Sequence, residues 1–158
     1  MINILFVCMG NICRSPSAEG FFANALQRSK FKDQVSHDSA GTHGYHVNHA
    51  PDSRAVETAI NYGVDIGHLR ARKVKPEDFY RYDLIVAMDH SNFADLQRIR
   101  PSDSKASVEM MMDYHPQGSP DEVPDPYYGG IDGFTYMCDL LQAATTGLLS
   151  KIEAQLSR

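Results

Sequence analysis

The most constraining feature of this sequence is an apolar run at its start that gives way to a loop and then to a helical pattern. Residues 2–7 are almost all apolar and have the length of a strand, which is typical of a strand covered on both faces. Ser15 and Pro16 then supply a helix N-cap and a first-turn proline. Apolar residues recur after them at helical spacing, namely Ala18, Phe21, Phe22, Ala25 and Leu26.

The same alternation of strand and helix continues to the end of the chain. Further strands are predicted at 34–40, 82–88 and 107–111, and further helices at 52–62, 91–98 and in a long C-terminal segment. Strands interleaved with helices predict an α/β fold, a single-domain doubly wound parallel four-stranded sheet with helices on both faces. The whole chain, residues 1–158, is expected to be this one domain.

Ligands of such a sheet bind beyond the carboxyl ends of its strands, near the point where the strand order reverses. The first strand ends at Cys8, and two long irregular segments, 41–51 and 112–130, follow predicted strands. Long loops in a compact domain are usually functional. We therefore expect the site at this edge.

Composition and charge exclude several classes of function. The formal net charge of −5 is unsuited to nucleic acid, which requires clustered Lys and Arg. No apolar run approaches the roughly 18 residues of a membrane span, and 4–7 is too short for a signal peptide core. Three cysteines do not form a disulfide framework. We expect a cytoplasmic protein without membrane insertion or nucleic-acid binding.

The segment between the first strand and helix carries the chemistry. A loop of this length can turn its backbone N–H groups inward, and the following helix adds positive charge, which makes a cradle for a tetrahedral dianion. Arg14 can bind two phosphoryl oxygens, and Cys8 facing the same positive concavity is expected to be a thiolate. Ser15 can donate to that thiolate. The predicted phosphate-binding residues of the loop are Met9, Gly10, Asn11, Ile12, Cys13 and Ser15.

These residues resemble the signature of the low-molecular-weight protein tyrosine phosphatase family. The match runs from Val7 to Pro16 and includes Ala18 and Glu19, with Met9 where Leu or Val is more usual. It extends over nearly the whole chain, through 39–42, Pro51, His68 with Ala71 and Arg72, 87–89 with Asn92, and 125–128. The resemblance implies hydrolysis of phosphotyrosine through a cysteinyl-phosphate intermediate, without a cofactor.

The resemblance also assigns roles outside the loop. Asp125, between two prolines, is expected to be the general acid and then the general base. Tyr127 and Tyr128 are expected to flank the substrate ring and are candidate phosphorylation sites, and Tyr45 would form the opposite wall unless it is an ordinary loop aromatic. His68 is expected to order the catalytic loop by hydrogen bonds with Asn11, Ser15 and Ser39.

Cys13 lies in the same curled loop as Cys8, and a disulfide between the two would protect the nucleophile from irreversible oxidation. We therefore predict that peroxide inactivates the protein reversibly. Cys138 lies on the apolar face of the last helix and is interpreted as a core residue.

Three other interpretations compete with this one. His43, His46 and His49 recur at intervals of three, but their segment is irregular and no carboxylate or cysteine completes a metal set nearby, so no metal is predicted. An arsenate reductase-like redox enzyme would need two more cysteines in mid-chain, and 14–137 has none. A non-catalytic phosphate-binding module would lack the nucleophile, Arg or acid.

The expected partner is a tyrosine-phosphorylated protein, and the expected state is a monomer or weak homodimer.

Overall fold

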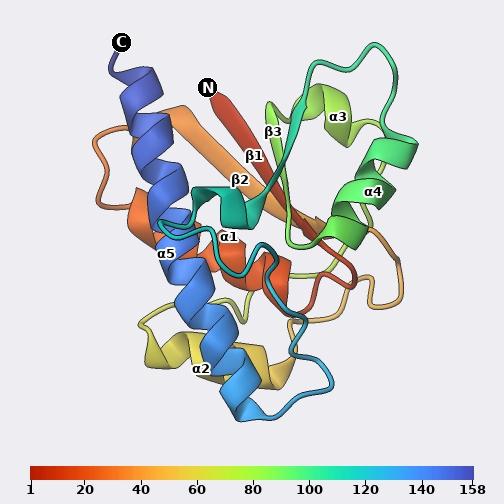
Figure 1. Cartoon of the computed structure of the whole chain (residues 1–158), viewed down its shortest axis with the longest axis vertical. Helices are drawn as coiled ribbons and strands as arrows, with labels where there is room; N and C mark the ends of the chain where they lie inside the picture. Colours follow the sequence, from red (N-terminus) through yellow and green to blue (C-terminus); the bar gives the residue numbers. More distant parts are fainter.

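The computed structural model describes residues 1–158 and is built around one parallel sheet (Figure 1). Its four strands lie in the order β2-β1-β3-β4, and every neighbouring pair is parallel. Their bounds are Ile2–Cys8 for β1, Val35–Gly41 for β2, Leu84–Ala87 for β3 and Ser107–Met110 for β4. The predicted parallel sheet is confirmed.

Helices cover both faces of the sheet. The α-helices are α1 (Arg14–Leu26), α2 (Ser53–Asn61), α3 (Asp78–Arg81), α4 (His90–Ile99) and α5 (Ile131–Leu156), and the 3₁₀ turns are η1 (Lys32–Gln34) and η2 (Met111–Tyr114). Figure 1 shows the sheet between α1 and α5 on one side and α3 and α4 on the other. The short elements α3, η1 and η2 were not predicted, because one turn leaves no apolar periodicity to detect.

Alternation along the central strand divides the interior into two hydrophobic clusters. Ile4 and Phe6 of β1 belong to a larger cluster with residues of α1, α2 and α5. Leu5 and Val7 belong to a smaller cluster with Phe79 of α3 and residues of α4. Side chains of a strand point alternately to opposite faces, so the continuous apolar run at the N-terminus follows from burial on both sides.

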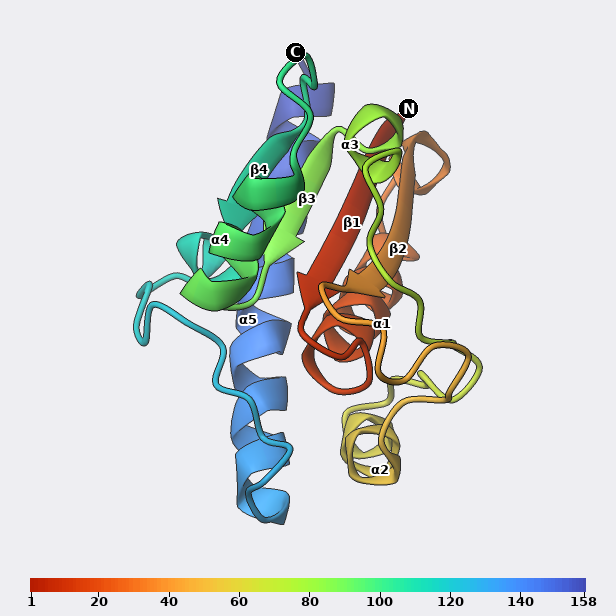
Figure 2. The ribbon, with the colours of Figure 1, turned by 90° about the vertical axis from the view of Figure 1, so that its right-hand side faces the viewer.

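The chain leaves β1 toward β2 on one side and later returns to β3 on the other, so the strand order reverses at β1. The arrowheads of the strands point to one end of the molecule, where the loops after β1 and β2 lie (Figure 2). Cys8, the last residue of β1, is therefore at the edge where ligands bind in such sheets. No helix combines the length and apolarity that crossing a membrane requires.

Gly147 marks the closest approach between α5 and the η2 segment. A Cβ atom at this position would lie 2.0 Å from the carbonyl oxygen of Tyr114, which is main chain and cannot rotate away. We expect Gly147→Ala to destabilise the protein by about 1–3 kcal/mol, the usual cost of overpacking. Urea unfolding measures this change as a lower midpoint.

Gly133, at the start of the same helix, is the matched control. A Cβ atom there would meet Pro126 at 3.7 Å, an ordinary contact. Gly133→Ala is expected to leave stability unchanged or to raise it by about 0.5–1 kcal/mol through helix propensity. Equal unfolding midpoints for the two variants would contradict the close approach at Gly147.

Candidate active site

The segment after β1 curls around the sulfur of Cys8. Cys8 is only 2% exposed, and the backbone N–H of Asn11 donates to its Sγ at 3.3 Å. Asn11 has φ of 58°, in the left-handed region that asparagine tolerates better than most residues. This turn reverses the chain so that α1 begins at Arg14 with its N-terminus toward the loop. The arrangement is a nest for an anion held over a buried sulfur.

A buried network fixes the hydroxyl of Ser15 beneath this loop. The amide nitrogen of Asn11 donates to Ser15 Oγ at 2.8 Å and to Ser39 Oγ at 3.0 Å, which uses both of its hydrogens. Ser15 Oγ lies 3.0 Å from Cys8 Sγ and 3.4 Å from the carbonyl oxygen of Ala40. Since Ser15 accepts from Asn11, its own proton is free to stabilise a thiolate at Cys8 through the shorter contact.

His68 does not join this network, contrary to expectation. Its side chain is exposed, and it lines a different cavity next to Glu19 and His37. The remaining polar atom of the key asparagine, Asn11 Oδ1, accepts instead from the backbone N–H of Arg72 at 3.0 Å. A main-chain donor therefore completes the network.

Arg14 is held by two partners from distant parts of the chain. Its side chain is only 3% exposed. Its Nη1 donates to Asp89 Oδ2 at 2.6 Å and to the carbonyl oxygen of Val123 at 3.1 Å. Burial opposes the charge on Arg14, but the neighbouring sulfur and carboxylates outweigh it and raise the pKa of the guanidinium. Nη2 remains directed toward Asp125, 3.6 Å from its Oδ2.

Asp89 is a site residue that sequence reasoning missed. It follows β3 and also caps α4, because its Oδ1 accepts from the N–H of Asn92 at 2.7 Å. With one oxygen on the helix and the other on Arg14, it anchors the guanidinium rigidly. Its position just beyond the carboxyl end of the strand beside β1 was the signal that could have identified it.

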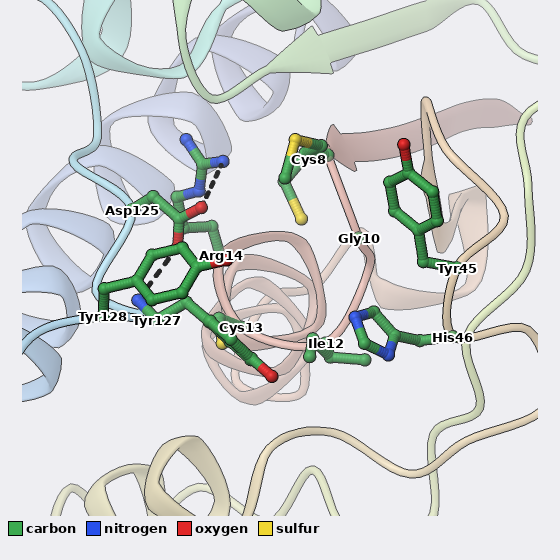
Figure 3. A pocket seen from close by; sticks show the side chains of 11 residues that line it. Cys8, Gly10, Ile12, Cys13, Arg14, Tyr45, His46, Asp125, Tyr127 and Tyr128 are labelled. Carbon is green, nitrogen blue, oxygen red and sulfur yellow. Dashed lines mark hydrogen bonds and ion pairs between the residues drawn. The ribbon is translucent and has the colours of Figure 1, made fainter.

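The predicted acid and aromatic residues lie with the phosphate loop, residues 8–15, around one cavity of about 290 Å³. Figure 3 shows Asp125, Tyr127 and Tyr128 on one side of Cys8 and Tyr45 on the other. The residues that line it are Cys8, Met9, Gly10, Ile12, Cys13, Arg14, Tyr45, His46, Asp125, Tyr127 and Tyr128. The cavity thus combines a thiol floor, a carboxylate and aromatic walls.

The three histidines of the loop after β2 do not form a set that could hold a metal ion. The ring of His43 stacks on that of Tyr45, with centroids 5.2 Å apart. The ring of His46 lies near those of His49 and Tyr127, at centroid distances of 6.0 and 6.3 Å. His46 therefore forms part of the wall of the cavity above Cys8. The spacing of the histidines did not predict this position.

The other two cysteines are buried and free. Burial is the main cause that raises the pKa of Cys13, so this thiol stays protonated at neutral pH. Burial likewise raises the pKa of Cys138 to about 12 and this residue belongs to the larger core cluster, which confirms its interpretation as a core residue. The disulfide between Cys8 and Cys13 stays a prediction.

The start of α2 connects the phosphate loop to the loop that carries Asp125. The N–H of Asp52, which caps this helix, donates to the carbonyl oxygen of Ile12 at 2.8 Å. Arg54 pairs with Asp52 at 2.9 Å and donates to the carbonyl oxygens of Tyr127 at 2.9 Å and Gly129 at 3.3 Å. Arg54 therefore holds the segment just after Asp125 and is a positioning residue.

We expect Arg54→Ala to lower kcat for aryl phosphates with poor leaving groups by about 10-fold, because a displacement near 1 Å at a reacting group can cost up to 100-fold. Arg54→Lys should also lower kcat, but by less than Arg54→Ala, since an ammonium keeps the charge and cannot reach two carbonyl oxygens and a carboxylate together. Steady-state kinetics over a series of substituted phenyl phosphates measures it.

Arg28, an exposed residue after α1, provides the control substitution. Arg28→Ala changes the net charge equally and should leave kcat unchanged for every leaving group. If Arg54→Ala raised KM alone and spared kcat, the proposed positioning of the acid would be wrong.

Comparisons with known proteins agree with this geometry. Residues 3–158 match the family model described as low molecular weight phosphotyrosine protein phosphatase. A relative of that description from Schizosaccharomyces pombe is 43% identical over 84% of this chain and 85% of its own. A low molecular weight protein-tyrosine-phosphatase from Streptomyces coelicolor is 38% identical over 97% and 94%. The crystal structure of a protein tyrosine phosphatase from Entamoeba histolytica superimposes with a TM-score of 0.93 at 37% identity, covering 98% and 99%.

Proposed function

Because the chain belongs to the low molecular weight phosphotyrosine protein phosphatase family, we propose that it hydrolyses phosphotyrosine in proteins with Cys8 as nucleophile, Arg14 as phosphoryl clamp and Asp125 as acid and base. The observation that carries this assignment is the meeting of all three at one cavity. The buried sulfur forms its floor, the guanidinium lies beside it, and the carboxylate stands 3.6 Å from Arg14 Nη2.

The first step transfers the phosphoryl group to the enzyme. The thiolate of Cys8 attacks phosphorus, the S–P bond forms, and the bond from phosphorus to the tyrosyl oxygen breaks. Asp125 donates its proton to that oxygen, so tyrosine leaves neutral. The loop N–H groups and Arg14 stabilise the charge on the equatorial oxygens throughout.

The second step returns the enzyme to its starting state. Asp125, now a carboxylate, takes a proton from a water molecule whose oxygen attacks phosphorus. The S–P bond breaks, inorganic phosphate forms, and the electron pair returns to sulfur. Ser15 stabilises the departing thiolate through the 3.0 Å contact with Cys8.

The walls of the cavity support an aryl substrate. Tyr45 and Tyr128 are 70% and 93% exposed, so both rings stand at the mouth, while Cys8 lies buried below them. A phosphotyrosine side chain is long enough to pass between such walls and reach the sulfur, and its ring gains stacking there. A phosphoserine side chain is too short to reach with its backbone kept outside.

The test compares a phosphotyrosyl peptide with the same peptide carrying phosphoserine, by release of inorganic phosphate. We expect kcat/KM to be higher for phosphotyrosine by at least about 100-fold, which corresponds to roughly 2.7 kcal/mol of transition-state stabilisation. With p-nitrophenyl phosphate, a burst of nitrophenol equal to the enzyme concentration would reveal the phosphoenzyme. Arsenate-dependent oxidation of thioredoxin without phosphatase activity would instead support the redox alternative.

A further inference from the structure

A second cavity lies beside the catalytic one and has no role in the steps above. It has a volume of about 370 Å³ and is lined by the segment that follows β2, by residues that follow Arg72, and by α4. The lining residues are Thr42, His43, Lys73, Val74, Pro76, Asp95, Arg98 and Ile99. None of them lines the catalytic cavity.

Two stacked rings form the wall between the cavities. Tyr45 faces the catalytic cavity and His43 the second one, and their rings lie 5.2 Å apart at an angle of 14°. Hydrogen bonds fix the wall, because His43 donates its N–H to the carbonyl oxygen of Met9 at 3.0 Å and its ring lies 2.9 Å from Thr42 Oγ1. The wall is thus tied to the phosphate loop.

The spacing of the two rings in this wall is less than the length of two extended peptide residues. An extended residue spans about 3.3–3.6 Å, so two residues cover roughly 7 Å. This exceeds the 5.2 Å between the ring centroids. One residue is therefore too short to cross the wall, so when the substrate chain leaves across Tyr45 the second neighbour of the phosphotyrosine is the first that can lie over the second cavity.

The second cavity offers a positive charge that is not paired with a carboxylate, since its one acidic residue, Asp95, is paired with Arg98. The aliphatic part of Lys73 packs beside Gly44, where its Cδ would lie 3.6 Å from a Cβ atom. Its ammonium takes part in none of the ion pairs of the chain. Arg98 also lines the cavity but is paired with Asp95 at 2.7 Å. Lys73 is thus the charge available to an incoming anion.

The opposite side of the catalytic cavity has the reverse polarity. Asp125 stands there, and Asp121 and Glu122 precede it in the same loop, both in contact with His90. An acidic substrate residue would be repelled from that side and attracted to the side of Lys73. The two sides therefore distinguish the directions in which a charged peptide can cross the mouth.

We propose that the second cavity binds the carboxylate of an Asp or Glu that lies two or three residues from the phosphotyrosine of a substrate protein, with Lys73 as its charge partner. The apolar side chains of Val74, Pro76 and Ile99 receive the methylene groups of that residue. This proposal rests on the function proposed above, because a phosphotyrosine held over Cys8 is what brings its neighbours across Tyr45.

The test is a set of phosphotyrosyl peptides in which Glu or Gln occupies each position from three before to three after the phosphotyrosine. We expect Glu to raise kcat/KM over Gln by about 5- to 10-fold at a position two or three residues away on one side. In Lys73→Glu this preference should vanish or reverse, while kcat/KM for p-nitrophenyl phosphate, which does not reach the second cavity, stays unchanged.

Lys105→Glu is the matched control, since this exposed lysine lines a separate cavity and the change in net charge is the same. It should keep the preference for Glu. The proposal would be overturned by an equal preference for Glu in wild type and Lys73→Glu, or by no preference at any position. If wild type still hydrolyses p-nitrophenyl phosphate in that case, the proposed function stands. Failure of wild type on every phosphate ester would overturn the proposed function itself.

Discussion

Replacing Cys8 by Ser is expected to abolish turnover of phosphotyrosyl peptides and aryl phosphates, with kcat reduced by on the order of 10⁴- to 10⁶-fold, as for removal of other enzymic nucleophiles. A serine hydroxyl in this position has no base beside it, since its hydrogen-bond partners are the N–H of Asn11 and the hydroxyl of Ser15. The alkoxide would be both harder to form and a poorer leaving group than the thiolate.

Binding of phosphate separates loss of chemistry from loss of the site. The loop N–H groups and Arg14 are unchanged in Cys8→Ser, so calorimetry should find inorganic phosphate bound with at most a few-fold change in affinity. Cys138→Ala serves as control, because Cys138 lies in the core away from the cavity. Residual kcat above about 1% in Cys8→Ser would be incompatible with a nucleophilic Cys8.

Replacing Asp125 by Ala is expected to lower kcat by about 100- to 1000-fold for phenyl phosphate, within the usual range for a general acid. The rate of phosphoenzyme formation from p-nitrophenyl phosphate should fall far less, because nitrophenolate leaves without a proton, whereas hydrolysis of the phosphoenzyme loses its base with either substrate. The side chain is about one-third exposed, lies 3.6 Å from Arg14 Nη2, and accepts from the N–H of Tyr127 at 3.0 Å, so it is oriented at the mouth.

Asp121→Asn is the matched control for this experiment. Asp121 is an exposed carboxylate of the same loop, paired with His90 rather than with Arg14. Its substitution should leave the dependence of kcat on leaving-group pKa unchanged. If Asp125→Ala slowed the release of good and poor leaving groups equally, its assignment as the acid would fail.

The sheet and the phosphate loop could be predicted because their determinants are local. Residues 2–16 hold the apolar run, the turn and the start of α1, so strand, loop and helix follow one another without distant contacts. Asp125 is different, because an Asp between prolines is usually a turn residue and its role came from a family resemblance. The cavity supports that role by bringing Asp125 beside Arg14.

The rest of the site depends on contacts between residues far apart in the sequence. Asp89 is 75 positions from Arg14, and Arg54 is 73 from Tyr127, so neither pairing leaves a local pattern. The error at His68 has the same origin. The expectation for His68 came from the family resemblance, whereas the structure places the backbone N–H of Arg72, 61 positions away, on Asn11.

The hydrogen bond from Arg14 to the carbonyl oxygen of Val123 spans 109 positions, and it has a consequence for how activity is gained during folding. Such a contact closes only after the intervening chain has been ordered, and non-local contacts form slowly. The proposed phosphoryl clamp, Arg14, therefore reaches its final position late. On refolding, catalytic activity should recover no earlier than the last structural phase, which makes hydrolysis of an aryl phosphate a sensitive reporter of complete folding.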